Sequence, residues 1–219
     1  MNKIRILIAD AEIDPVPEKL WKHPAIVSDS KRRRRHPSKM LLYIPIHYTA
    51  MIEHNIPLEG FGRPDITHRI LLTVLDHPLN KRGLLEIYVY TRNRGELIWV
   101  NPDVRLPLDY YRFEGLMIQL LEKGRVPPNT GELIKIVREK TLEDIVEKPI
   151  IMEKEGRLFT DYNPKDLLGR TIIVGAFQRG DYSPKVKKLT NEYISIYEET
   201  LLASTAISIL LTYIYLSIT

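Results

Sequence analysis

A short polar stretch, RPDITH from Arg63 to His68, carries side chains that could do chemistry. Its guanidinium, carboxylate and imidazole groups allow three interpretations: a metal or acid/base site, an anion clamp, or a capped helix start. Histidine spacing disfavours a metal. None of the six histidines has another three or four residues away, the spacing that places two imidazoles on one helix face. We therefore predict no metal site.

A second stretch, VNPDVRLPLDYYRF, places Arg105 and Arg112 on either side of the tyrosine pair Tyr110 and Tyr111. Arginines beside aromatic rings are typical of surfaces that contact single-stranded RNA, where the rings stack on bases. The same residue types also suit a helix start with core aromatics. The residue types alone leave both interpretations open.

The third stretch is a pair of segments, IIVGAFQRG and ISIYEETLLAS. An apolar run opens into a loop bounded by Gly175 and Gly180, and glycine lets a ligand approach the backbone closely. In α/β folds such loops at the carboxyl edge of a parallel sheet bind small molecules. The common phosphate, zinc-protease and serine-hydrolase motifs are absent from the sequence.

The elements that position these stretches alternate between strand and helix patterns. Strands are predicted at 3–12, 84–91, 96–102, 148–155 and 170–177, and helices at 47–55, 63–76, 111–124, 131–147 and 201–219. Pro64 and Asp65 suit the first turn of a helix, and Gly124 suits a helix end. The alternation predicts an α/β fold with a mostly parallel sheet, in one domain spanning 1–219.

Two further segments, 14–40 and 201–219, each need a separate interpretation. Asp14 to Pro37 contains four prolines and the run KRRRR (Lys31 to Arg35), and this composition predicts an irregular basic excursion over about 14–40. That run suits either a solvated mobile loop or a funnel for phosphate. Leu201 to Thr219 has no charge and is long enough to span a bilayer, but six Ser or Thr residues favour a helix buried in a core or subunit interface.

Composition narrows the class of protein. The chain of 219 residues has a net charge of +4 and no cysteine. Disulfides, thiolate metal sites and cysteine nucleophiles are therefore excluded, and an intracellular protein is favoured. A small positive net charge is compatible with nucleic-acid binding but does not establish it.

The three stretches together resemble one family, the ribosome-biogenesis pseudouridine N1-methyltransferases of the SPOUT class. The resemblance runs through FGRPDITHRILLTVLDHPLNKRGLLEIYVYT, ELIWVNPDVRLP, RFEGLMIQLL, VGAFQRG and ISIYEETLLAS, from about Phe61 onward, and is looser over the first sixty residues. It implies an α/β knot with a C-terminal trefoil, a homodimer, and a location in the cytoplasm, or in the nucleolus if the protein is eukaryotic. The implied reaction is methyl transfer from S-adenosylmethionine to N1 of a pseudouridine in small-subunit ribosomal RNA.

The resemblance also implies roles for particular residues. RNA would be contacted by Arg63, Arg105 and Arg112, and Asp65 would hold the guanidinium of Arg63 by a charge-assisted pair. Leu108 stands where family members often carry a third arginine, so one phosphate contact is expected to be missing. The cofactor would be lined by Gly175, Gly180, Ile196, Tyr197, Glu198, Glu199, Thr200 and Leu201.

Two points stay open at this level. No general base is assigned, because a carboxylate paired with arginine has a lowered pKa and makes a poor base; His68 is expected to be structural. The alternative function is that of an RNA-binding ribosome assembly factor whose methyltransferase activity is secondary or absent.

Overall fold

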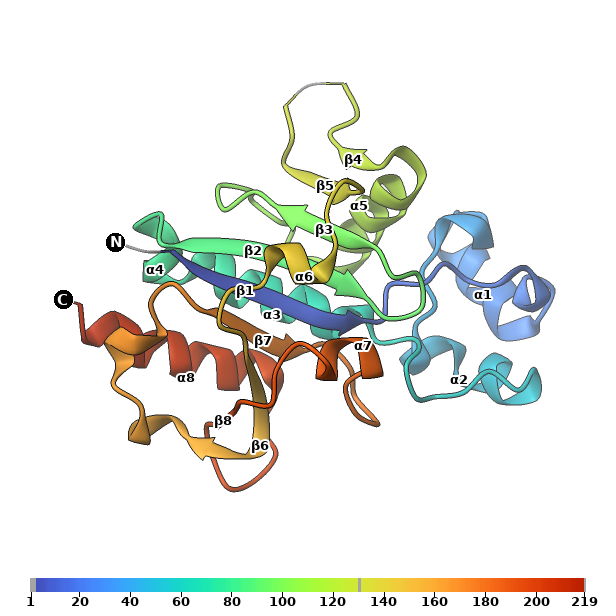
Figure 1. The fold of residues 1–219 in the computed structure, drawn as a ribbon. Helices are drawn as coiled ribbons and strands as arrows, with labels where there is room; N and C mark the ends of the chain where they lie inside the picture. Colours follow the sequence, from blue (N-terminus) through green and yellow to red (C-terminus); the bar gives the residue numbers. More distant parts are fainter. Residues whose placement is uncertain (1–2, 130, 219) are drawn as a thin grey trace.

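The computed structural model describes residues 3–129 and 131–218, which form an eight-stranded sheet flanked by helices (Figure 1). The strand order across the sheet is β4-β5-β3-β2-β1-β7-β6-β8. The strands are β1 (Ile4–Ala11), β2 (Leu85–Thr91), β3 (Leu97–Val100), β4 (Arg125–Val126), β5 (Ile134–Val137), β6 (Ile150–Leu158), β7 (Thr171–Gly175) and β8 (Tyr193–Ser195).

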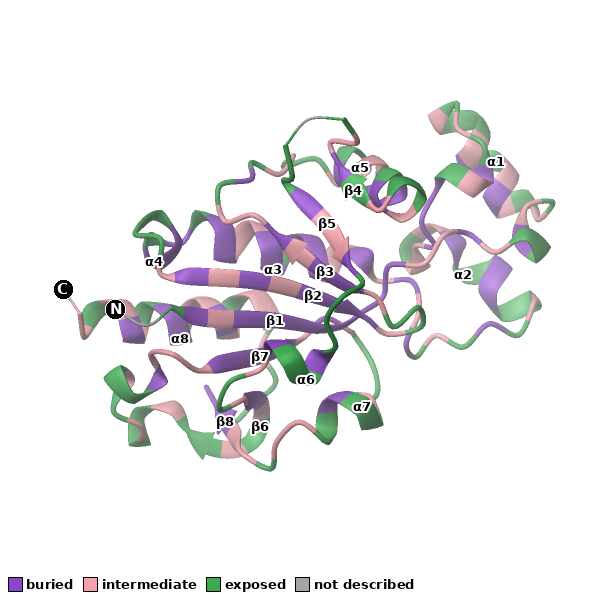
Figure 2. Cartoon of the chain, turned by 45° about the horizontal axis from the view of Figure 1, so that its top comes forward, coloured by how far each residue is buried: buried purple, intermediate pink, exposed green. Residues whose placement is uncertain are grey.

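The sheet has a parallel half and an antiparallel half. β1 pairs in parallel with both β2 and β7, and β6 pairs in parallel with β7 and β8. Beyond β2 the strands β3, β5 and β4 are antiparallel, which confirms the predicted hairpin at 84–102. The apolar run of β1 is buried on both faces, as expected for a central parallel strand, and Figure 2 shows the central strands as mostly buried.

Helices cover both faces of the sheet. One face holds α3 (Pro64–Asp76), α4 (Pro78–Lys81), α5 (Tyr110–Lys123) and α8 (Ala203–Leu216), which pack with Ile4, Ile6 and Ile8 of β1. The other face holds α6 (Leu142–Ile145) and α7 (Pro184–Lys187), which pack with Leu7 and Ala9. The predicted helices at 63–76 and 111–124 are confirmed, with Pro64 in the first turn of α3 and Gly124 in the left-handed conformation after α5.

The irregular excursion predicted for about 14–40 is wrong, because the segment is largely helical. It contains α1 (Pro24–Arg33), which packs on α2 (Ile44–Glu53), and two 3-10 turns, Glu18–Leu20 and Pro37–Lys39. These elements lie beyond the carboxyl end of β1 in Figure 1 and enclose a small apolar core of their own. That core, which includes Leu20, Ile26 and Met51, stabilises α1 despite the prolines around it.

The single helix predicted at 131–147 is also wrong. Residues Ile134–Val137 form β5, which pairs with β3 and β4, and only Leu142–Ile145 are helical. A capping box between Thr141 and Asp144 starts this short helix. Further 3-10 turns cover Phe159–Asp161 and Pro164–Leu167.

The uncharged C-terminal stretch forms α8, which packs along α3 through Ile207, Leu210, Leu211 and Ile214. Within the described residues, no helix is both long enough and apolar enough to cross a membrane. The core-helix interpretation is confirmed for this buried face of α8. Its other face leaves Leu202, Ile209 and Leu216 exposed, and these residues follow one another at seven-residue intervals.

Candidate functional site

A cavity of about 590 Å³ opens where the carboxyl end of β7 meets the segment before α8. The N-terminal part of α3 and residues 152–154 of β6 close its other sides. Of the eight residues expected to contact a cofactor, Glu198 does not line this cavity. The other seven do: Gly175, Gly180, Ile196, Tyr197, Glu199, Thr200 and Leu201. The volume falls in the range of small-molecule sites.

Both glycines of the β7 loop stand where a side chain would disturb the cavity wall. A Cβ atom at Gly175 would lie 2.7 Å from Cε1 of Phe177, closer than such contacts normally occur. Gly180 has a φ of +80°, in the left-handed region that favours glycine. Both glycines line the cavity, so the absence of side chains there leaves the loop backbone open to a ligand.

Arg63 lies on the wall of the same cavity, and Asp65 holds its guanidinium. Nε and Nη2 of Arg63 donate to the two carboxylate oxygens of Asp65 at 2.8 and 2.9 Å, which is a bidentate pair. Arg69 donates to the same carboxylate at 2.7 Å. Burial alone would raise the pKa of Asp65, but the bonds and charges of Arg63 and Arg69 outweigh it, so the pKa lies below its ordinary value. A carboxylate with a lowered pKa is a poor general base.

A second carboxylate holds the backbone of Arg63. Glu12 follows β1, and its Oε2 accepts the N–H of Arg63 at 3.0 Å. The Glu12 side chain is buried and its other oxygen, Oε1, has no hydrogen-bond partner. Burial is the main reason why the pKa of Glu12 is raised to about 7, although the N–H of Arg63 and the charge of Arg92 lower it. Backbone and guanidinium of Arg63 are thus both fixed.

The loop between β3 and α5 carries the other expected RNA contacts. Arg105, Leu108 and Arg112 are all exposed, and Leu108 is 85% exposed, so nothing in the described chain covers its apolar side chain. Asp109 begins α5 by accepting the N–H of Arg112 at 2.9 Å. The three residues therefore lie exposed at the surface, and none of them lines the cavity that Arg63 lines.

His68 ties this loop to α3. Its Nε2 donates to the carbonyl oxygen of Pro107 at 2.7 Å, and its ring stacks on Phe113 with centroids 4.2 Å apart. Burial lowers the pKa of His68 despite the Pro107 hydrogen bond, so the ring is neutral at physiological pH. This geometry agrees with the structural role expected for His68, because the imidazole N–H is already hydrogen-bonded to Pro107.

Sequence reasoning missed several residues of the site. Phe177, Gln178 and Ser204 also line the cavity, and Glu12 stands behind Arg63. The signal available for Glu12 was its place directly after a buried parallel strand, at the edge where α/β folds bind ligands. Across residues 3–129 and 131–218, no cluster of three or more His, Asp or Glu side chains is arranged to hold a metal ion.

Fold and cavity together define an α/β protein with a glycine-bounded ligand site at the carboxyl edge of parallel strands. Residues 6–214 match the sequence model of the EMG1/NEP1 methyltransferases, and the chain belongs to this family.

Known relatives cover most of the chain. It is 37% identical over 209 residues to "Ribosomal RNA small subunit methyltransferase Nep1" of Staphylothermus marinus, covering 90% of this chain and 89% of that protein. It is 38% identical to the protein of the same name from Pyrococcus furiosus, over 94% of each. Among solved structures, Archaeoglobus fulgidus Nep1 bound to S-adenosylhomocysteine superposes with a TM-score of 0.84 at 32% identity, over 99% of both chains.

Proposed function

We propose that the protein methylates N1 of a pseudouridine in small-subunit ribosomal RNA, with S-adenosylmethionine as methyl donor, during ribosome biogenesis. The observation that carries this proposal is the cavity between the Gly175–Gly180 loop and the 196–201 segment, with Arg63 on its wall. Family membership and the solved relative that binds S-adenosylhomocysteine support the same reaction.

The residues of the cavity fit this cofactor. Its wall combines exposed backbone at Gly175 and Gly180 with apolar side chains such as Ile196 and Leu201, which suit an adenine ring and a ribose. We assign the cofactor contacts to the eight residues that the family resemblance implies; Glu198, which lies outside the cavity wall, would contribute through its backbone. When bound, S-adenosylmethionine supplies an electrophilic methyl group on its sulfonium.

The chain itself orients the target base. Pseudouridine carries a proton on N1, which must pass to solvent water when N1 is methylated, because no side chain is assigned as general base. Arg63, held by Asp65 and Glu12, presents a fixed positive charge beside the cavity, where it can bind RNA phosphate or stabilise negative charge on the base. Arg105 and Arg112 extend this surface. A base held there must be turned out of its stack.

We further propose a trefoil knot, a homodimer and a single domain. The 196–202 segment lies against the Gly175–Gly180 loop before the chain enters α8, which is the arrangement that a threaded C-terminus requires. The exposed stripe of Leu202, Ile209 and Leu216 on α8 supports a second copy as its partner. A small-subunit RNA substrate places the protein in the cytoplasm, or in the nucleolus of a eukaryote.

The reaction is tested with hairpin RNAs that carry either pseudouridine or uridine at one loop position. We expect transfer of one methyl group to the pseudouridine RNA alone, detected by mass spectrometry, because N1 of uridine is bonded to the sugar. Calorimetry with S-adenosylmethionine provides the control for cofactor binding. Absence of binding at millimolar cofactor, with RNA still bound, would favour an assembly factor without methyltransferase activity instead.

The arginine surface gives a second prediction. Arg63→Ala and Arg105→Ala are each expected to weaken RNA binding by about 1–3 kcal/mol while cofactor affinity stays unchanged, because these side chains contact phosphate or base. Leu108→Arg is the matched gain-of-charge variant and should tighten RNA binding. Equal loss of RNA and cofactor affinity in the alanine variants would mean that the arginines support the fold. Filter binding and calorimetry measure the two affinities.

A further inference from the structure

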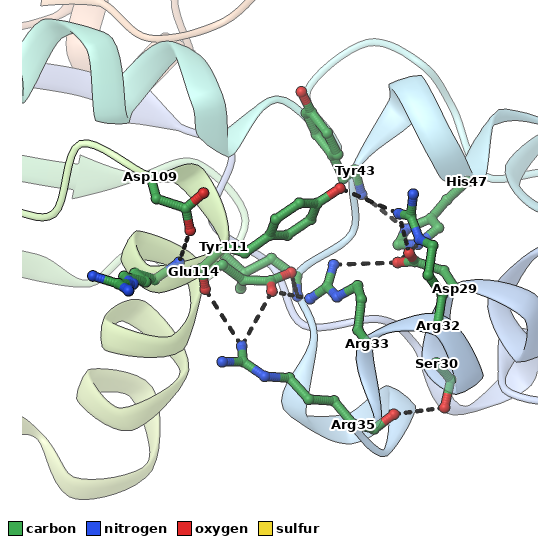
Figure 3. Close-up of polar contacts among 12 residues, drawn as sticks. Asp29, Ser30, Arg32, Arg33, Arg35, Tyr43, His47, Asp109, Tyr111 and Glu114 are labelled. Carbon is green, nitrogen blue, oxygen red and sulfur yellow. Dashed lines mark hydrogen bonds and ion pairs between the residues drawn. The ribbon is translucent and has the colours of Figure 1, made fainter.

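The basic run Lys31 to Arg35 divides into buried and exposed members. The side chain of Arg33, at the end of α1, is only 7% exposed and contacts Asp29 of its own helix and Glu114 of α5 (Figure 3). Its guanidinium also lies over the ring of Tyr111, 4.7 Å from the centroid. These contacts of Arg33 hold the end of α1 against α5. They therefore also fix the position of the backbone from which Arg34 and Arg35 continue.

The turn after α1 is held by hydrogen bonds of its own. Arg34 ends the helix in the left-handed conformation, with a φ of 52°, a position where helices usually have glycine. The N–H of Arg35 donates to the carbonyl oxygen of Ser30 at 3.1 Å, and the Ser30 hydroxyl donates back to the carbonyl oxygen of Arg35. The strain at a non-glycine residue is thus maintained by the surrounding contacts.

An open groove lies between this turn and α5. Its walls carry the cations Arg34, Arg35, Lys39 and Lys123, with Gln119 between them on α5. Arg35 crosses α5 above Gly115, since a Cβ atom built at Gly115 would stand 3.4 Å from Nη1 of Arg35. Two acids lie nearby: Glu122 pairs with Lys39, and Glu114, paired with Arg33, lies 3.6 Å from Arg35. Arg34 and Lys123 are exposed and make no side-chain ion pair among those described.

The groove continues the arginine surface of the candidate site. Arg112, Gln119 and Lys123 follow the same exposed side of α5 at seven- and four-residue intervals. From Arg112 to Lys123 the helix rises by about 16 Å, enough to accompany several successive phosphates of a nucleic-acid strand. The N-terminal end of α5 lies near the segment before Arg63, because Tyr110 stacks on Tyr43 with centroids 4.6 Å apart and the N–H of Ile44 donates to the carbonyl oxygen of Gly62 at 2.9 Å. A strand that left the cavity on this side would therefore reach α5 and its groove.

We propose that this groove binds the phosphate backbone of the RNA that flanks the target nucleotide. The inference rests on the proposed function and extends its RNA surface to a segment outside the residues expected from the family. Contacts with phosphate depend on charge and not on the base sequence. They therefore raise the affinity for RNA and make binding more dependent on salt, without changing which nucleotide is modified.

The test compares two RNAs and three double variants, of which two remove charge and one keeps it. One RNA is a minimal pseudouridine hairpin, and the other extends it by about ten nucleotides at both ends, long enough to pass the groove. For Arg34→Ala/Lys123→Ala we expect roughly tenfold weaker binding of the extended RNA and a salt slope reduced by about 1 to 2, with the minimal hairpin bound as by the wild type. The control Lys140→Ala/Lys165→Ala removes the same charge from exposed sites that line neither cavity.

Three outcomes would overturn the proposal. Wild-type affinity of the groove variant for the extended RNA would leave the groove to another polyanion, such as an acidic protein segment. Equal losses on both RNAs, or equal losses in both double variants, would indicate a general charge effect. Arg34→Lys/Lys123→Arg, which keeps both charges, should bind like the wild type. All of these measurements are of binding, so a wild-type protein that fails to methylate would count against the proposed function and leave the groove comparison intact.

Discussion

Replacing Arg33 by methionine is expected to lower the free energy of unfolding by about 3–5 kcal/mol at neutral pH. The side chains of Arg33, Asp29 and Glu114 are 7%, 1% and 0% exposed, so the substitution leaves two buried carboxylates without their shared cation. Arg32 still pairs with Asp29, and Arg35 still lies 3.6 Å from Glu114, but these two side chains are 60% and 38% exposed, so water screens both charges and they compensate only in part. His47 is neutral, since its Nδ1 accepts the N–H of Tyr43 and its Nε2 donates to Asp29 at 3.2 Å. Urea denaturation followed by tryptophan fluorescence measures the loss.

The neighbouring residue supplies the matched control. Arg32 also pairs with Asp29, at 2.6 Å, but its side chain is 60% exposed. Arg32→Met is therefore expected to change the free energy of unfolding by no more than about 0.5 kcal/mol. Similar losses in the two variants would contradict the role of burial. Arg33→Met/Glu114→Gln should recover part of the stability, because it removes one stranded charge and keeps an acceptor for the N–H of Leu41.

The loss in Arg33→Met should also depend on pH. Burial raises the pKa of Glu114 in the wild type, although Arg33 and the N–H of Leu41 lower it. Without Arg33 that pKa rises further. A carboxyl group whose folded pKa lies above its unfolded value is stabilising below the unfolded pKa, and this stability is lost as the pH rises through the folded pKa. The variant should therefore be less destabilised near pH 4 than near pH 8.

Glu12→Gln is expected to raise the free energy of unfolding at neutral pH and to make that free energy depend less on pH. The pKa of Glu12 is raised from 4.5 to about 7, chiefly by burial. The folded state favours the protonated form of Glu12. The stability that this protonation contributes is therefore fully present below about pH 4.5, and it is lost as the pH rises through about 7. A shift of this size corresponds to about 3 kcal/mol. Glutamine keeps an acceptor for the N–H of Arg63 and cannot ionise.

Denaturation of the wild type and of Glu12→Gln at pH 5 and pH 8 tests this. The difference between the two proteins should be small at pH 5 and approach about 3 kcal/mol at pH 8, in favour of the variant. Glu18→Gln, at an exposed position, is the control and should not change the profile. A Glu12 variant that is destabilised equally at both pH values would mean that the carboxylate is charged and needed for packing.

The parts of the fold that could be predicted are those whose cause is local. α3 and α5 follow from apolar periodicity with proline and glycine at their ends, and the Arg63–Asp65 pair joins residues two positions apart. The contribution of the 196–201 segment to the cavity wall could be inferred only through the resemblance, because residues 175–180 and 196–201 meet through the fold.

The errors come from long-range contacts. The helix α1 is stabilised by Glu114 and His47, which lie far along the chain from Arg33 and Asp29. β5 has helix-compatible residues, but pairing with β3 and β4 makes it a strand. Glu12 acts on Arg63 across 51 positions, so its role has no signature within either segment.

The place of β1 in the sheet has a consequence for synthesis of the chain. β1 lies between β2 and β7, and Arg5 is paired with Thr171. A strand translated early must therefore wait for one translated late before its second edge is hydrogen-bonded. Pairings so distant in sequence raise the contact order and slow folding. The nascent chain carries one open apolar edge until β7 leaves the ribosome, and this is the period when it most needs protection from aggregation.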